Sequence, residues 1–195
     1  MNAAAMATAK LFLAALAALL LASEAVWADT VARKEQLCAS CHGKNGLPSD
    51  RTVPIIRGQQ AAYLKKQLDD YRNGDRESQI MSSIAESLSE EEIAQIATDF
   101  GDAKWPEQFA VLLPAAPAAT EVCKTCHNAD LTGGTSPSGI APRLAGQNSA
   151  YLVDTIAAYA TGERANSTVM GPCSDTSASP RPLSTRWCSL SNELG

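Results

Sequence analysis

Two short segments of the chain share one spacing of cysteine and histidine. Each has two cysteines three positions apart, with a histidine directly after the second cysteine. The first copy is Cys38, Cys41 and His42, and the second is Cys123, Cys126 and His127. On a helix, residues three positions apart lie on the same face. Two such thiols can form thioether bonds to the vinyl groups of a haem while the adjacent imidazole binds the iron, and the motif is the signal for covalent haem attachment.

Other chemistries also use paired cysteines. A C-x-x-C pair can be a redox dithiol or half of a zinc site. A dithiol enzyme needs a thioredoxin-like βαβ frame, and the sequence has no alternating strand pattern. A zinc site built from both pairs needs ligands 85 residues apart to converge, and it leaves both histidines without a role. We therefore interpret the motifs as attachment sites for two covalently bound haem c groups.

The two motifs belong to two copies of a longer pattern, here called the first and second repeats. Beyond the motifs, residues match at a constant offset of 88 positions. The matched pairs are Pro54 and Pro142, Gly58 and Gly146, Gln59 and Gln147, Tyr63-Leu64 and Tyr151-Leu152, Tyr71 and Tyr159, Gly74 and Gly162, and Arg76 and Arg164. The motifs themselves are 85 positions apart, so the second repeat carries three extra residues. We place them in the Gly/Ser/Thr/Pro-rich stretch 132–139, because loops tolerate insertions. The sequence thus predicts two tandem domains of about 75 to 80 residues.

The N-terminus has the pattern of a secretory signal peptide. Lys10 precedes an apolar run of twelve residues, Leu11 to Ala22, and Val26-Trp27-Ala28 follows. This run is too short to span a bilayer comfortably, and a small residue suits the cleavage position. We expect cleavage after Ala28, with an uncleaved anchor as the alternative.

These patterns predict four segments of the chain. They are a signal peptide at 1–28, a first domain at 29–103, a proline-containing linker at 104–118 and a second domain at 119–195. The net charge is −5 and no basic run occurs, which argues against nucleic acid as a partner.

Helical patterns surround the motifs, and the predicted fold class is all-α. A helical stretch from Val31 to Ser40 leads into the first motif. Apolar spacing predicts a helix over 59–73 capped by Gly74, and a matching helix over 149–161. Ser89 and Glu92 form a capping box that begins a further helix, which we expect Gly101 to end.

The second axial ligand of each iron follows by elimination. Both histidines of the chain lie in the motifs, and Met1 and Met6 lie in the signal peptide. Met81 and Met170 remain, one in each repeat and at matching places. A thioether is a good iron ligand, although a methionine can also simply fill a core. With histidine and methionine on each iron, no position stays open for small molecules, and the iron only accepts and donates electrons.

At these residues the chain resembles class I c-type cytochromes, and its tandem arrangement resembles the dihaem cytochrome c4 family. The similarity runs from about Val31 to Met170. It implies two class I cytochrome c domains packed against one another. It also implies that the carbonyls of Pro54 and Pro142 accept hydrogen bonds from the motif histidines, which orients the rings.

The resemblance further implies a periplasmic carrier that is not an enzyme. Its partners would be an electron donor complex and a terminal oxidase, with peripheral association with the membrane. Two alternatives are a haem subunit of a larger periplasmic oxidoreductase and a dihaem peroxidase. A peroxidase needs an iron that can open, and the chain has no further histidine to supply a His/His haem.

The end of the chain departs from the family pattern. The resemblance implies a helix after Met170 that packs on the first helix of its own domain. Instead, the tail 171–195 is rich in Ser, Thr and Pro and has no apolar helical face. We expect the second domain to lack its usual C-terminal helix, through a reading-frame change or recent divergence. Cys173 and Cys188 lie in this tail, and their only expected chemistry is pairing in an oxidising compartment.

Overall fold

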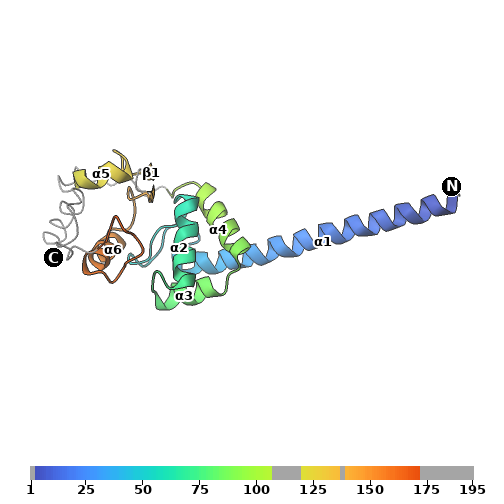
Figure 1. Cartoon of the computed structure of the whole chain (residues 1–195), viewed down its shortest axis with the longest axis horizontal. Coiled ribbons are helices and arrows are strands. Elements are labelled where there is room, and N and C mark those ends of the chain that lie inside the picture. Colours follow the sequence, from blue (N-terminus) through green and yellow to red (C-terminus); the bar gives the residue numbers. More distant parts are fainter. Residues whose placement is uncertain (1–2, 107–119, 137–138, 172–195) are drawn as a thin grey trace. The chain divides into compact units, whose positions relative to one another are not determined.

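The computed structural model describes residues 3–106, 120–136 and 139–171. Helices dominate these residues, and the only strands among them form one two-stranded hairpin (Figure 1). The all-α prediction is confirmed. The chain separates into two compact units, Met1–Cys38 and Ala39–Gly195, and each is considered by itself.

A single helix, α1 (Ala3–His42), makes up the first unit and continues into the start of the second. The described part of the predicted signal peptide, residues 3–28, lies in this helix. Several large apolar side chains on it are exposed, among them Leu11, Phe12 and Leu13. None of the helices in the described parts of the chain combines the length and the apolar character that crossing a bilayer requires.

The second unit contains five more helices in the described residues. They are α2 (Ala61–Asn73), α3 (Gln79–Glu86), α4 (Glu90–Asp102), α5 (Glu121–His127) and α6 (Ser149–Thr161). The hairpin strands are β1 (Gly134–Ser136) and β2 (Gly139–Ala141), which pair antiparallel. The hairpin falls in and beside the stretch 132–139, where the sequence predicts an insertion.

In the first repeat, α2 packs against both α3 and α4. Ile93 and Ile96 on α4 are almost fully buried, and so is Ile55 in the loop before α2. The predicted capping box begins α4: the Ser89 hydroxyl accepts from the Glu92 amide, while the Glu92 carboxylate accepts from the Ser89 amide. The Gly58 amide donates to the Phe100 carbonyl of α4 at 2.7 Å, which ties the loop that precedes α2 to this helix.

The second repeat reproduces the middle helix of the first. The bounds of α6 match the prediction, and α2 begins two residues later than predicted. Both helices end at a left-handed glycine, Gly74 with φ 81° and Gly162 with φ 80°. Since glycine lacks a Cβ, it adopts this conformation without steric cost. The same chain reversal therefore follows the middle helix in both repeats.

The structure of the first repeat shows two features that were not predicted from the sequence. Gly101 does not end α4, which continues to Asp102. A Cβ on Gly101 would lie 2.7 Å from the Ala61 Cβ, so this glycine allows α4 to approach α2 rather than terminating the helix. In addition, α3 is a helix that the periodicity did not predict.

Parts of two predicted segments lie outside the described residues. Of the linker 104–118, only Lys104 to Pro106 are described, and they form neither helix nor strand. Of the tail 171–195, only Gly171 is described. Cys173 and Cys188 therefore also lie outside the described residues.

Replacing Gly101→Ala should destabilise the folded protein by about 1 to 3 kcal/mol, because overpacking forces the backbones of α2 and α4 apart. Thermal or urea unfolding of the haem-loaded protein measures the change. Thr98→Ala, on the exposed side of the same helix, serves as the control and should change the stability by less than about 0.5 kcal/mol. A Gly101→Ala protein as stable as the control would contradict this account of the contact.

Candidate haem-binding sites

The two cysteine motifs form the last turns of two helices. Cys38, Cys41 and His42 end α1, and Cys123, Cys126 and His127 end α5. The four cysteines form no disulfide in the described part of the chain. In each motif the thiols are therefore three residues apart on a helix, directly before the histidine. No cluster of three or more His, Cys, Asp or Glu side chains within residues 3–106, 120–136 and 139–171 is placed to hold a metal ion.

Both motif histidines are buried and held by a backbone carbonyl. The Nδ1 atom of His42 lies 2.8 Å from the Pro54 oxygen, and Nδ1 of His127 lies 2.7 Å from the Pro142 oxygen. Because a carbonyl oxygen can only accept, Nδ1 must carry the ring proton. Nε2 is then the nitrogen whose lone pair can bind iron.

Burial controls the charge of these rings. It lowers the pKa of His42 and of His127 from the ordinary value, and this effect outweighs the hydrogen bond to the prolyl carbonyl, which acts in the opposite direction. Both imidazoles are therefore neutral at neutral pH, which is the form that binds metals.

The two methionines follow a serine in the same way in both repeats. The Met81 amide donates to the Ser78 hydroxyl at 3.3 Å, and the Met170 amide donates to the Ser167 hydroxyl at 3.2 Å. Ser78 is the N-cap of α3, and the pattern Ser-x-x-Met is common to both repeats. Sequence reasoning missed these serines, although this shared spacing was the signal that could have found them. Both methionine side chains are half-buried.

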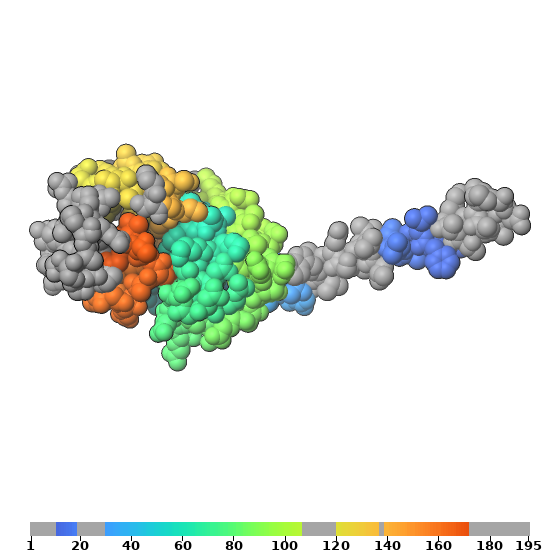
Figure 2. Space-filling model, in the orientation of Figure 1, coloured from blue at the N-terminus to red at the C-terminus, as the bar shows by residue number. Residues whose placement is uncertain are grey.

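Side chains after the two middle helices join the repeats. Each arginine stacks on a tyrosine of its own repeat, Arg76 on Tyr71 at 4.6 Å and Arg164 on Tyr159 at 4.4 Å. Each also reaches a tyrosine hydroxyl of the other repeat: the Arg76–Tyr151 distance is 3.5 Å and the Arg164–Tyr63 distance is 3.3 Å. This crossed arrangement follows from the 88-residue repeat. In Figure 2, residues of the first repeat (cyan to green) and the second (orange) lie next to each other.

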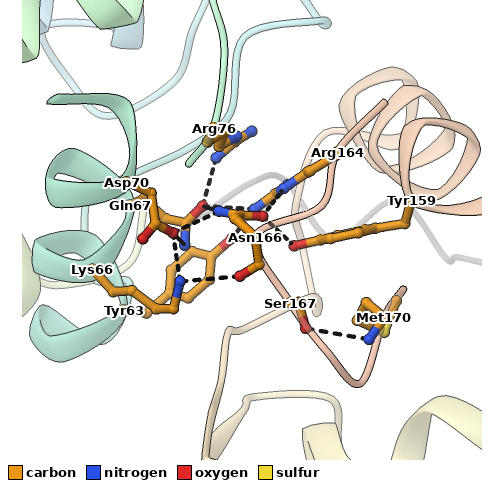
Figure 3. A network of polar contacts seen from close by, with 10 residues as sticks. All are labelled: Tyr63, Lys66, Gln67, Asp70, Arg76, Tyr159, Arg164, Asn166, Ser167 and Met170. Atoms are coloured by element: carbon orange, nitrogen blue, oxygen red, sulfur yellow. Dashed lines mark hydrogen bonds and ion pairs between the residues drawn. The ribbon is translucent and has the colours of Figure 1, made fainter. Parts of the chain in front are cut away.

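Two polar residues of α2 break this symmetry. The side-chain amide oxygen of Gln67, Oε1, accepts from Arg76 at 2.8 Å, from Arg164 at 2.6 Å and from Asn166 at 3.1 Å (Figure 3). The Asp70 carboxylate accepts from Asn166 at 2.6 Å. Gln67 and Asp70 are buried on a helix face where apolar residues are usual. They are satisfied there by Arg164 and Asn166 of the second repeat, together with Arg76 and Lys66 of the first.

One buried atom of this network lacks a partner, and it bears on the fit of a haem. Nη1 of Arg164 is buried without a hydrogen-bond partner in the described residues. A buried guanidinium group normally binds a carboxylate, and the propionate groups of haem are carboxylates. The paired thiols, the neutral buried imidazoles and this open cationic donor are all suited to haem.

Comparisons with known proteins give the same assignment. The chain is 32% identical over 177 residues to the thiosulfate dehydrogenase electron acceptor of Stutzerimonas stutzeri, covering 79% of this chain and 81% of that one. It is 30% identical over 142 residues to cytochrome c4 of Pseudomonas aeruginosa, covering 68% and 71%. The solved cytochrome c4 of Acidithiobacillus ferrooxidans superposes with a TM-score of 0.57 at 29% identity, covering 68% and 85%.

No protein-family model matches the chain. The similarity to curated relatives over 79% and 68% of the chain, the solved structures of the same fold and the two cysteine motifs nevertheless agree. The chain belongs to the cytochrome c4 family: it is a dihaem class I c-type cytochrome, an electron-transfer protein with two covalently bound haem c groups.

Proposed function

We propose that the chain is a periplasmic electron carrier, not itself an enzyme, that accepts single electrons from an oxidoreductase and passes them towards a terminal oxidase. The observation that carries this proposal is that the same set of site residues occurs in both repeats. Each repeat contains a thiol pair, a neutral histidine held by a prolyl carbonyl, and a methionine whose amide is held by a serine. Two like sites in one chain are suited to relaying electrons.

The residues of each site have separate roles in this proposal. Cys38 and Cys41 bind the first haem covalently, and Cys123 and Cys126 bind the second. His42 with Met81, and His127 with Met170, are the axial iron ligands. The carbonyls of Pro54 and Pro142 orient the two imidazoles. When bound, each haem supplies an iron that carries one electron.

Location and partners rest on the sequence and on the relatives. The signal peptide directs export of the chain to the periplasm, and it is cleaved after Ala28. The relative from Stutzerimonas stutzeri is named as an electron acceptor of thiosulfate dehydrogenase, so an oxidoreductase of this kind is the proposed donor. A terminal oxidase is the proposed acceptor, with peripheral association of the carrier at the membrane surface.

A haem subunit within a larger periplasmic oxidoreductase is the second candidate. It is favoured by another relative, named as the cytochrome subunit of sulfide dehydrogenase of Chlorobaculum tepidum, to which the chain is 40% identical over 65 residues. A dihaem peroxidase is a weaker alternative. Both histidines of the chain are already assigned to the haem motifs, and methionine on both irons leaves no open position for peroxide.

The haem-loaded protein should take up one electron per haem from thiosulfate dehydrogenase supplied with thiosulfate, and membranes that contain a terminal oxidase should reoxidise it. Optical spectroscopy follows both steps, and a monohaem variant serves as a control for the electron count. Since both iron positions are filled, carbon monoxide should not change the spectrum of the reduced protein. Rapid carbon monoxide binding together with peroxide turnover would instead favour the peroxidase.

Replacing each cysteine pair should remove one haem. Cys38→Ser with Cys41→Ser, and separately Cys123→Ser with Cys126→Ser, should each leave one covalent haem, because thioethers form only on the remaining thiols. Haem quantitation after acid–acetone extraction measures this. If either double variant retained both haems, or lost both while still folded, the assignment of the motifs would be wrong.

Replacing Ser78→Ala should loosen Met81 from its iron, because the N-cap of α3 is lost at a cost of about 1 kcal/mol. The near-infrared charge-transfer band of methionine-ligated iron(III) should then disappear at lower urea concentration than in the unchanged protein. Ser83→Ala is the matched control, because that hydroxyl donates to the Gln79 carbonyl on the exposed face of the same helix. Equal urea dependence in the two variants would count against this role of Ser78.

A further inference from the structure

The residue after each histidine-holding proline is bound by a glutamine of the other repeat. The Ile55 amide donates to Oε1 of Gln147 at 2.8 Å, and Nε2 of Gln147 donates back to the Ile55 carbonyl at 2.9 Å. In the other direction, the Arg143 amide donates to Oε1 of Gln59 at 2.7 Å, and Nε2 of Gln59 donates to the Arg143 carbonyl at 3.0 Å. Each glutamine thus pairs with a backbone residue as a neighbouring strand would.

These contacts share a peptide group with the histidine contacts. The carbonyl of Pro54 and the amide of Ile55 belong to one planar peptide unit. His42 donates to one end of that unit, and Gln147 accepts from the other end. The Pro142–Arg143 peptide joins His127 to Gln59 in the same way, although there the Arg143 amide also donates to Oε1 of Gln60 at 3.2 Å. Each histidine is therefore connected by two hydrogen bonds in series to a glutamine of the opposite repeat.

The local backbone directs both glutamines to this contact. Each follows a glycine in the left-handed region, Gly58 with φ 75° and Gly146 with φ 77°. A Cβ on Gly58 would lie 2.6 Å from the Trp105 backbone nitrogen, and a Cβ on Gly146 would lie 3.1 Å from the Trp105 ring nitrogen. Gln59 is 3% exposed, so water does not compete for its hydrogen bonds.

We infer that Gln147 and Gln59 are positioning residues that each tune the haem of the opposite repeat. Hydrogen bonds in series polarise one another and strengthen. An acceptor at the amide end makes the prolyl oxygen a better acceptor for the imidazole, which raises the basicity of the iron ligand. A more basic imidazole stabilises iron(III) and lowers the reduction potential. The inference rests on the proposed function, because it takes His42 and His127 as iron ligands.

The crossed connection predicts a crossed effect. Gln147→Leu, a change in the second repeat, should raise the reduction potential of the first haem and leave that of the second haem nearly unchanged. Gln59→Leu should do the opposite, with a smaller shift because Gln60 remains as an acceptor for the Arg143 amide. A redox titration followed by NMR resolves the two haems. In the reduced protein, the ring N–H resonance of His42 should move upfield in Gln147→Leu, as expected for a weaker hydrogen bond, while the resonance of His127 stays in place.

Asn148→Ala is the matched control for this test. The Asn148 side chain also crosses between the repeats, donating to the Val53 carbonyl at 2.7 Å, but that carbonyl is not in the peptide that holds His42. This variant should weaken the packing between the two repeats without moving the His42 resonance. If Gln147→Leu does not fold, Gln147→Met removes the same acceptor with an unbranched side chain of similar length, and the His42 resonance should again move upfield.

The outcomes separate this inference from the proposed function. A protein without two covalent haems overturns both. Two haems with histidine and methionine ligands, combined with an unmoved His42 resonance in the glutamine variants, overturn only the inference. Equal shifts of both haems in Gln147→Leu, or a shift as large in Asn148→Ala, would likewise show a general loosening of the contact and overturn it.

Discussion

The hydrogen bond from each motif histidine to a prolyl carbonyl is the constraint from which the other features of the sites follow. It fixes Nδ1 as the protonated nitrogen and leaves Nε2 for iron. The carbonyl must therefore be held still, although it lies in a loop before the middle helix. In the first repeat, the buried Ile55 side chain anchors that loop, and the backbone of the same residue is bound by Gln147. The position of His42 thus depends on contacts that its own repeat does not supply.

The repeated sequence makes this dependence mutual. Because Gln59 and Gln147 occupy matching positions, each repeat gives the other the same contact. The arginine and tyrosine side chains cross between the repeats in the same manner. Gln67 and Asp70 are exceptions, since the matching positions are Thr155 and Ala158. The first repeat therefore carries more of the buried polar groups, and the two haem environments are similar without being identical.

Local patterns in the sequence predicted much of the fold and of the site. The cysteine motifs, the offset of 88 residues, the capping box at Ser89 and the bounds of the 149–161 helix depend on neighbouring residues and were readable directly. The helix that carries Met81 was missed, because its eight residues are too few for a clear periodicity. Gly101 was wrongly predicted to end its helix. A glycine is needed there because a larger residue would collide with Ala61, forty positions earlier. The glutamine contacts join residues 84 and 92 positions apart, and no local pattern records such a contact. The repeat did mark both glutamines as matched positions, which was the only trace of their role in the sequence.

The central claim is that both irons of one chain are bound by a histidine and a methionine. X-ray absorption spectroscopy of the oxidised protein at the iron edge tests this most directly, because it averages over the two irons and distinguishes sulfur from nitrogen ligands. The account predicts one sulfur ligand per iron, with nitrogen from porphyrin and imidazole completing the coordination. Loss of half of that sulfur signal in the Met170→Ala protein, and of the other half in the Met81→Ala protein, would assign the two sites. A spectrum of the unchanged protein that requires no sulfur, or only one sulfur for every two irons, would contradict the account.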